Sequence, residues 1–498
     1  MSVSSLKPDK TARRNSENLS GALKYFIQTF GCQMNYSDTE RVAAILEKSG
    51  YQKAEQLEEV DLFIFNTCSI KQKGEDRVYG IIKNIGQMKK ANPRLLIGIT
   101  GCMVRQTSSR NSEWDKKDDL LKNLKPLDFV FRITDTGTLP AVLAEAEPLL
   151  ELSEIEDITP QSNTDYLRVK PEYTTKFQAF VPIQIGCDKY CTYCIVPYSR
   201  GREQSRPLSE ILTECRQLVE NGCKEITLVG QTVNSYGLSA LDQKSPNFAD
   251  YHGLRSQGAR PELPFIRLLR ELNALSELGL DRLRYTSPHP RDLTDELIEA
   301  HATFKVLCPY IHLPVQSGDN QVLARMNRKY TVEQYREKVT KLRARIPHCA
   351  ISTDLIVGFS GETEEQFENT YRLFEEMQWD QAYISRYSER KGTLAHKAFP
   401  DNIPAEEKAR RWHKVNNLLK KVSLKNHQAL EGKVLEVLVE TYLPLTKECQ
   451  GKSREMKIVQ FPGTPDLIGT IQKIKIEKGL DWLLKGTNPL FKNSGELA

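Results

Sequence analysis

The 498-residue chain contains no apolar run that approaches the roughly 20 residues of a membrane-spanning helix. This absence excludes a spanning protein, and no membrane partner is expected. The polar N-terminus also lacks the apolar stretch of a secretory signal. We therefore predict a disordered tail over residues 1–21 and a cytoplasmic protein.

Charge of one sign is not in large excess, because 70 Lys and Arg face 65 Asp and Glu for a net charge of +5. The excess is unevenly distributed, since residues 408–485 hold 16 basic and 8 acidic side chains, a net charge of +8. Such a region is typical of a polyanion-binding surface, although a solvated helix face has the same composition. The chain length predicts two to four domains, and 39 % hydrophobic residues suffice to build their cores.

Disulfides are not expected among the 11 cysteines, because a cytoplasmic compartment keeps thiols reduced. Six of these cysteines fall into two groups of three, and the other five are scattered. Such grouping favours metal ligation or catalysis.

The first group follows three short apolar runs, each of which ends one to three residues before a cysteine. These runs are 25–30, 62–65 and 95–99, followed by Cys32, Cys68 and Cys102. Strands that are apolar on both faces and alternate with helices predict a doubly wound parallel sheet. The first helix is expected to begin at a cap formed by Ser37 or Asp38.

The carboxyl ends of parallel strands share one edge, where ligands bind. The three thiols are therefore expected to converge at that edge, where they suit a soft metal or an iron–sulfur cluster. The alternative is that they are three small buried hydrophobic residues.

The second group is a CxxxCxxC loop after an apolar run at 179–185, and it consists of Cys187, Cys191 and Cys194. A structural zinc site needs a fourth protein ligand, and the loop contains no histidine. The spacing instead favours a 4Fe–4S cube that leaves one iron open for a substrate or cofactor.

Six predicted strands alternate with helices and indicate an open or partial (β/α) barrel. They are 179–185, 225–229, 282–286, 310–315, 351–357 and 382–387. Polar residues and glycines follow the strand ends, where barrel enzymes keep their sites, and include Gly230, Gln231, Ser287, His289, Gln316, Ser317, Gly358 and Gly361. His289 and His312 are interpreted as packing residues, and 237–262 as a surface insertion.

Short strands at 434–439, 456–461, 468–476 and 482–484 predict a small closed β-barrel of the OB-like kind. A basic helix precedes them and contains Lys408, Arg410, Arg411, Lys414, Lys420, Lys421 and Lys425. Together they fit a nucleic-acid surface. The alternative is a structural cap on the larger barrel.

From residue 22 to 488, the chain resembles the radical S-adenosylmethionine methylthiotransferases, most closely the MiaB type that modifies transfer RNA. The motifs that carry the resemblance are 29–35, 66–70, 101–103, 186–194, 201–203, 287–292 and 312–318. The resemblance implies an N-terminal methylthiotransferase domain (22–147), a linker (148–175), a partial (β/α)6 radical SAM domain (176–420) and a C-terminal barrel like a TRAM domain (424–488).

The resemblance also implies two 4Fe–4S clusters and S-adenosylmethionine. Cys187, Cys191 and Cys194 would hold the radical cluster, which cleaves S-adenosylmethionine to a 5′-deoxyadenosyl radical. Cys32, Cys68 and Cys102 would hold an auxiliary cluster that carries sulfur, and further S-adenosylmethionine would supply the methyl group. The expected cofactor contacts are Tyr193, Gly230, Gln231, Ser287 and Gln316.

The implied product is a 2-methylthio group on isopentenyladenosine beside the anticodon. Such an unactivated C–H bond needs cofactor radical chemistry, and an anticodon loop offers unpaired bases. The implied partners are the transfer RNA anticodon stem-loop and an electron donor such as flavodoxin or ferredoxin, with the chain as a monomer. Two alternatives stay open. One is the same chemistry on threonylcarbamoyl-adenosine or on a ribosomal-protein aspartate, and the other is a non-enzymatic RNA-binding protein with structural zinc.

Overall fold

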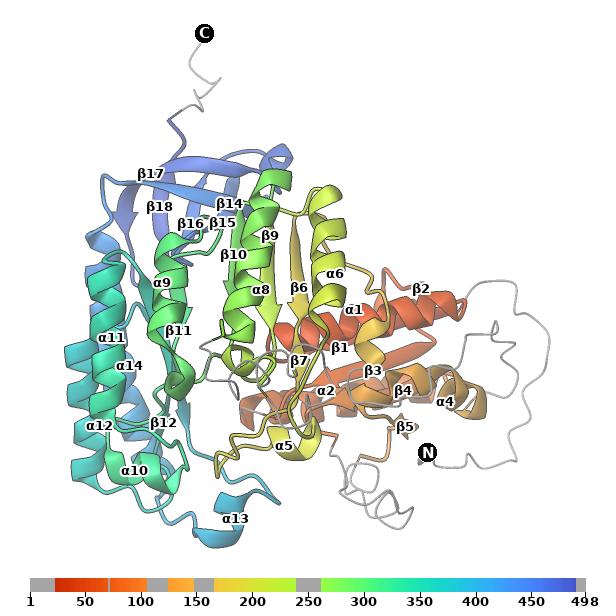
Figure 1. Ribbon diagram of the computed structural model, residues 1–498. Helices are drawn as coiled ribbons and strands as arrows, with labels where there is room; N and C mark the ends of the chain where they lie inside the picture. Colours follow the sequence, from red (N-terminus) through yellow and green to blue (C-terminus); the bar gives the residue numbers. More distant parts are fainter. Residues whose placement is uncertain (1–22, 70–71, 105–123, 147–164, 239–260, 490–498) are drawn as a thin grey trace.

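The computed structural model describes residues 23–69, 72–104, 124–146, 165–238 and 261–489, which form three parts in chain order (Figure 1). Across these ranges, no helix combines the length and apolarity needed to cross a membrane. The expected tail and most of the insertion at 237–262 lie outside the described residues.

The first part is a five-stranded parallel sheet with the order β2-β1-β3-β4-β5. Its strands are β1 (Lys24–Thr29), β2 (Gln52–Lys53), β3 (Leu62–Thr67), β4 (Leu96–Gly101) and β5 (Phe129–Val130). Helices α1 (Gln33–Lys48) and α4 (Leu139–Ala146) pack on one face, and α2 (Gln72–Ala91) packs on the other. The predicted doubly wound parallel sheet is confirmed.

Helix α1 begins at Gln33, so the predicted start at Ser37 or Asp38 is wrong. Cys32 is the N-cap residue, and its backbone N–H donates to Oδ1 of Asn35 at 3.3 Å. Ser37 and Asp38 lie inside the helix and are buried against the second part of the chain. Their polar side chains therefore belong to a tertiary interface, and in the sequence they resemble a helix cap.

The end of the segment expected as a linker packs against the first sheet. Residues 165–168 form a short 3₁₀ helix, and Tyr166 and Leu167 are buried in the same core as α1. The Tyr173 hydroxyl donates to Glu214 at 2.6 Å, which ties this segment to the second part.

The second part contains six described parallel strands. They are β6 (Gln178–Pro182), β9 (Glu225–Val229), β10 (Arg282–Tyr285), β11 (Tyr310–His312), β12 (Ala350–Val357) and β13 (Gln381–Arg386). A parallel bridge between Leu283 and Leu307 joins the two halves, and no pairing between β6 and β13 is found in the described ranges. The result is the predicted partial barrel.

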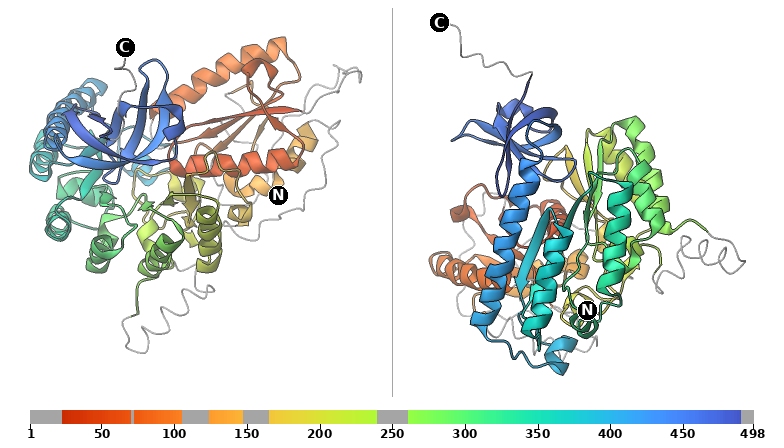
Figure 2. Two further views of the ribbon diagram at one scale, coloured as in Figure 1. Left: turned by 90° about the horizontal axis from the view of Figure 1, so that it is seen from above. Right: turned by 90° about the vertical axis from the view of Figure 1, so that its left-hand side faces the viewer.

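Helices cover the outer face of this barrel (Figure 2). They include α6 (Leu208–Glu220), α8 (Pro264–Asn273), α9 (Asp295–Thr303), α11 (Val332–Arg345), α12 (Glu364–Met377) and α14 (Ala405–Gln428). Thr331 and Thr363 form capping boxes at the starts of α11 and α12. Two short helices flank the site, α5 (Val196–Ser199) and α10 (Asn320–Arg325).

The third part is the predicted closed barrel, with the strand order β14-β15-β16-β18-β17. Its strands are β14 (Val434–Leu443), β15 (Glu448–Ser453), β16 (Ile458–Pro462), β17 (Ile471–Gly479) and β18 (Leu484–Thr487). The sequence did not indicate β15, because its buried side is Cys449, Gly451 and Ser453 rather than an apolar series.

This small barrel docks on the amino-terminal end of the larger barrel. Arg282 and Arg284 of β10 donate to four of its backbone carbonyls at 2.8–2.9 Å, and Glu225 of β9 accepts from Arg284 at 2.9 Å. In Figure 1 the small barrel lies at one end of the strands and α5 at the other. The small barrel therefore caps the end opposite the cysteine loop.

Candidate active site

Three cysteines, here called the N-terminal triad (Cys32, Cys68 and Cys102), lie at the carboxyl edge of the first sheet. They follow β1, β3 and β4, which are neighbouring strands. The chain passes from β1 outward to β2 and then back to β3, so the edge between β1 and β3 is a topological switch point. Ligands of doubly wound sheets bind at such a point.

A buried amide pair holds two of these loops together. Asn35 donates from Nδ2 to Oδ1 of Asn66 and to the Thr67 carbonyl, both at 3.1 Å, and Asn66 donates back to the Asn35 carbonyl at 2.7 Å. The Cys102 backbone N–H donates to the Thr67 carbonyl at 2.8 Å, which adds the third loop. The triad is therefore carried on a rigid frame.

The loops approach so closely that glycine is required. At Gly31, with φ +130°, an added Cβ would lie 2.3 Å from Oδ1 of Asn35 and 2.7 Å from Cβ of Cys68. At Gly101, with φ +92°, it would lie 2.3 Å from the Thr67 carbonyl oxygen. Both glycines thus allow the cysteine loops to meet.

The second set, here called the barrel triad (Cys187, Cys191 and Cys194), lies in the loop after β7 (Gln184–Ile185). The Cys194 N–H donates to the Cys191 carbonyl at 3.0 Å, and the Cys187 Sγ lies 3.0 Å from Oγ1 of Thr232. Burial raises the pKa of the Cys187 thiol to about 11 and also raises that of Cys194. Iron at these sulfurs would replace the protons that burial retains.

The two triads face one interface between the first and second parts. Arg200, at the end of α5, donates from Nη2 to Oδ2 of Asp38 on α1 at 2.6 Å, and both side chains are buried. Burial and the other two cysteines of the barrel triad raise the pKa of Cys194, and the charge of the nearby Cys102 adds to that rise. The fold therefore brings the two cysteine groups to the same site.

The residues fit the groups that the sequence implies. Each triad offers three thiols to an iron–sulfur cluster, although no three His, Cys, Asp or Glu side chains of the described ranges lie close enough together to hold one metal ion. Nε2 of His289 and Oε1 of Gln231 are buried at strand ends without a hydrogen-bond partner among the described residues. A bound cofactor can satisfy these atoms.

The expected cofactor contacts lie at the carboxyl ends of the barrel strands. Gly230 and Gln231 follow β9, Ser287 follows β10, and Gln316 follows β11. Ser287 has φ +57° and Gln316 has φ +73°, conformations that are uncommon for residues other than glycine and that gather at functional sites. Tyr193 lies between Cys191 and Cys194 in the sequence and is partly buried.

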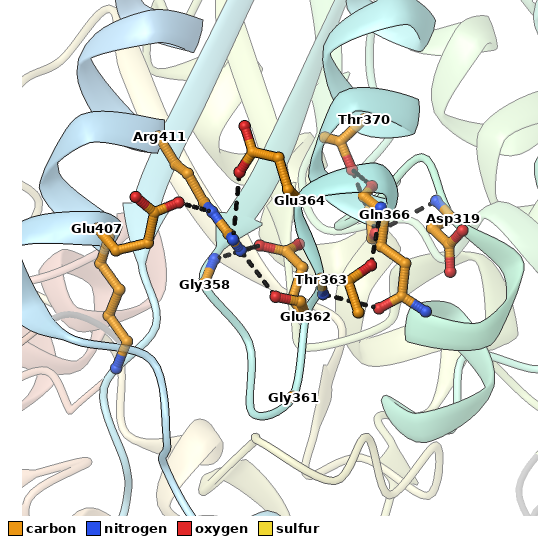
Figure 3. A network of polar contacts seen from close by, with 12 residues as sticks. Asp319, Gly358, Gly361, Glu362, Thr363, Glu364, Gln366, Thr370, Glu407 and Arg411 are labelled. Carbon is orange, nitrogen blue, oxygen red and sulfur yellow. Dashed lines mark hydrogen bonds and ion pairs between the residues drawn. The ribbon is translucent and has the colours of Figure 1, made fainter.

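A polar network shapes the loop after β12 (Figure 3). Oε2 of Glu362 accepts from the Gly358 N–H at 2.6 Å and from Nη1 of Arg411 at 2.8 Å. Burial raises the pKa of Glu362, and Arg411 opposes that rise. The sequence pointed to Gly358 but not to this carboxylate, because the Glu362 partner lies some fifty residues away on α14.

The sequence did not point to Arg328 or Arg200, and it predicted His289 as a packing residue. Burial and nearby cations lower the pKa of His289, so its ring is neutral and its Nδ1 accepts from the Arg291 N–H at 3.3 Å. Arg328 contacts a cysteine sulfur of the barrel triad. No sequence motif distinguishes these arginines from the many arginines that lie on protein surfaces.

A partial parallel barrel with a CxxxCxxC loop defines the class of radical S-adenosylmethionine proteins, and residues 181–374 match the radical SAM superfamily. Residues 24–122 match the uncharacterized protein family UPF0004, and residues 428–487 match the TRAM domain. The small C-terminal barrel is thus identified as a TRAM domain.

Curated relatives give the narrower group. The chain is 38 % identical over 473 residues to the tRNA-2-methylthio-N(6)-dimethylallyladenosine synthase of Clostridium botulinum strain Hall, with 95 % of this chain and 98 % of the relative covered. It is 38 % identical over 471 residues to the enzyme of the same name from Thermoanaerobacter sp. strain X514, with 94 % and 93 % covered. The chain belongs to the family of tRNA-2-methylthio-N(6)-dimethylallyladenosine synthases, which confirms the resemblance.

Among solved structures, the radical S-adenosylmethionine methyltransferase TsrM from Kitasatospora setae, with cobalamin and a [4Fe-4S] cluster bound, is 12 % identical. It covers 74 % of this chain and 75 % of its own, with a TM-score of 0.43. A likeness this weak adds nothing to the assignment.

Proposed function

We propose that the protein transfers a methylthio group to C2 of isopentenylated adenosine beside the anticodon of transfer RNA. The observation that carries the proposal is the meeting of two cysteine triads at one interface, in a chain of this family. The names of the relatives support the dimethylallyl (isopentenyl) substrate over threonylcarbamoyl-adenosine or a ribosomal aspartate.

The barrel triad would hold the radical cluster, and the N-terminal triad would hold the auxiliary cluster. When bound, the first cluster with S-adenosylmethionine supplies a 5′-deoxyadenosyl radical, and the second supplies the sulfur. The residues of the chain hold and orient these groups. The amide pair of Asn35 and Asn66 fixes the N-terminal triad, and Glu362 holds the loop that follows β12. The residues that would contact S-adenosylmethionine are Tyr193, Gly230, Gln231, Ser287 and Gln316.

The transfer RNA is held partly by the TRAM barrel. Lys473 and Lys475 project from β17 with exposed side chains, whereas Ile474 and Ile476 between and after them are buried. No ion pair of Lys473 or Lys475 is found within the described part of the chain. Exposed, uncompensated lysines suit phosphate contacts.

Much of the remaining basic charge is already paired. Arg411 bonds to Glu362 and Lys408 to Asp401, so the first half of α14 is a structural element rather than an RNA surface. Lys485 bonds to Glu448 at 2.7 Å in the TRAM barrel. The charge excess at residues 408–485 therefore overstates the surface available to RNA.

The geometry also favours a long substrate. The TRAM barrel caps the starts of the strands and the cysteine loop follows their ends. The eight residues of β12 alone span roughly 26 Å. A substrate that contacts both ends must exceed this length, as an anticodon stem-loop does and a free nucleoside does not.

Three further features remain part of the proposal. The protein acts in the cytoplasm, as a monomer, and receives electrons from a flavodoxin or ferredoxin.

The test is incubation of reconstituted enzyme with isopentenylated transfer RNA, S-adenosylmethionine and a reductant, followed by mass spectrometry of the nucleosides. The proposal expects 2-methylthio-isopentenyladenosine, with no product from transfer RNA that lacks the isopentenyl group. Product on threonylcarbamoyl-adenosine alone would overturn the substrate assignment.

A further inference from the structure

Arg328 is a buried arginine that touches the barrel triad. It follows α10 and is 5 % exposed. Its Nη1 donates to Sγ of Cys191 at 3.2 Å, its Nη2 donates to the Pro314 carbonyl at 2.9 Å, and its Nε donates to the Tyr330 hydroxyl at 3.0 Å. The guanidinium is thus fixed in three directions, one of which is the cysteine sulfur.

Arg328 differs from Arg200 and Arg411, two other buried arginines, because it has no carboxylate partner among the described residues. Arg200 bonds to Asp38 and Arg411 bonds to Glu362, whereas no ion pair of Arg328 with Asp or Glu is found in the ranges described. Burying an uncompensated charge is costly. An anionic group bound at the barrel triad would supply the negative charge that no Asp or Glu of the described ranges places beside this cation.

We propose that Arg328 is a positioning residue that hydrogen-bonds the Cys191 sulfur and raises the reduction potential of the radical cluster. This inference rests on the proposed function, because it needs a cluster at the barrel triad. A cube with three thiolates is anionic, and its negative charge grows by one electron on reduction. A fixed cationic donor stabilises the more negative state, since hydrogen bonds to the sulfurs and net charge set such potentials.

The test is an EPR redox titration of full-length reconstituted protein, following the signal that changes when S-adenosylmethionine is added. Arg328→Met removes the charge and the hydrogen bond, and Arg328→Lys restores the charge. Lys329→Met is the matched control, because it removes the same charge one residue away from an exposed side chain. Iron content and melting temperature are measured for each variant.

Arg328→Met is expected to lower the ratio of reduced to oxidised cluster at a fixed potential about tenfold, which corresponds to a midpoint lower by about 59 mV for one electron. Arg328→Lys should recover part of the shift, and Lys329→Met should show none. An iron-loaded Arg328→Met protein with the parental midpoint overturns the inference, and so does an equal shift in Lys329→Met.

Tyr330→Phe decides the case if Arg328→Met does not fold. It removes the hydroxyl that anchors Nε and leaves the charge, so a smaller shift in the same direction is expected, and an unchanged midpoint overturns the inference. Failure of the proposed function looks different. In that case the parent protein itself shows no cluster that responds to S-adenosylmethionine.

Discussion

The buried ion pair between Asp38 and Arg200 offers a sharp test of how the two cysteine triads are held together. The two atoms lie 2.6 Å apart, and the side chains are 1 % and 2 % exposed. Asp38→Ala leaves the guanidinium buried without its counter-charge, which costs about 3–5 kcal/mol. The Tyr166 hydroxyl, which donates to the other Asp38 oxygen at 3.2 Å, loses its acceptor as well. At about 2–4 °C per kcal/mol, the melting temperature should fall by about 6–20 °C.

The assay is thermal unfolding by circular dichroism, with hydrogen exchange to locate the loosened region at α1. Lys24→Ala is the matched control, because the Lys24–Glu59 pair has the same 2.6 Å separation but is exposed. Solvent screens such a pair, so little change is expected. Equal effects of the two substitutions, or a fall of less than about 3 °C for Asp38→Ala, would refute the reasoning.

Two further predictions follow from charge. Replacing Lys473 and Lys475 by alanine should weaken transfer RNA binding and reduce the slope of log affinity against log salt concentration by about 1.4 to 1.8. Lys485→Ala should change this slope less, because Glu448 already binds that lysine. Filter binding at several salt concentrations measures the slopes, and a double variant with the parental slope would contradict the prediction. Burial raises the pKa of Glu203 to about 7 from its usual 4.5, so the folded chain keeps a proton that the unfolded chain loses in this range. The free energy of unfolding should therefore fall as the pH rises from about 4.5 to about 7, and denaturant titration should find that Glu203→Gln flattens this dependence.

The strands that carry the cysteines were predictable because they are apolar on both faces and end at each cysteine. The position of all three N-terminal cysteines at one edge followed from parallel pairing alone. The start of α1 was not predictable, because the polarity of Asp38 reflects a partner 162 residues away rather than a local cap. Strand β15 escaped notice because small residues fill its buried side.

The candidate site divides in the same way. Cysteine spacing indicated the proposed ligands, and strand ends indicated Ser287 and Gln316, which the structure finds in left-handed conformations. Arg328 could not be predicted from the sequence, because its proposed role depends on a tertiary contact with Cys191, which lies 137 residues away in the chain. The predicted nucleic-acid surface on the basic helix was too large, because Arg411 binds the buried carboxylate of Glu362.

The central claim is that each triad holds its own cluster, and iron content together with product analysis tests it most directly. The parent should bind about eight irons, and alanine at either whole triad should leave about four. The variant without the N-terminal triad should still form 5′-deoxyadenosine from S-adenosylmethionine while making no methylthio product. Loss of all iron from either variant, a parent that holds only about four irons, or loss of 5′-deoxyadenosine from a variant whose barrel cluster is intact would contradict the account.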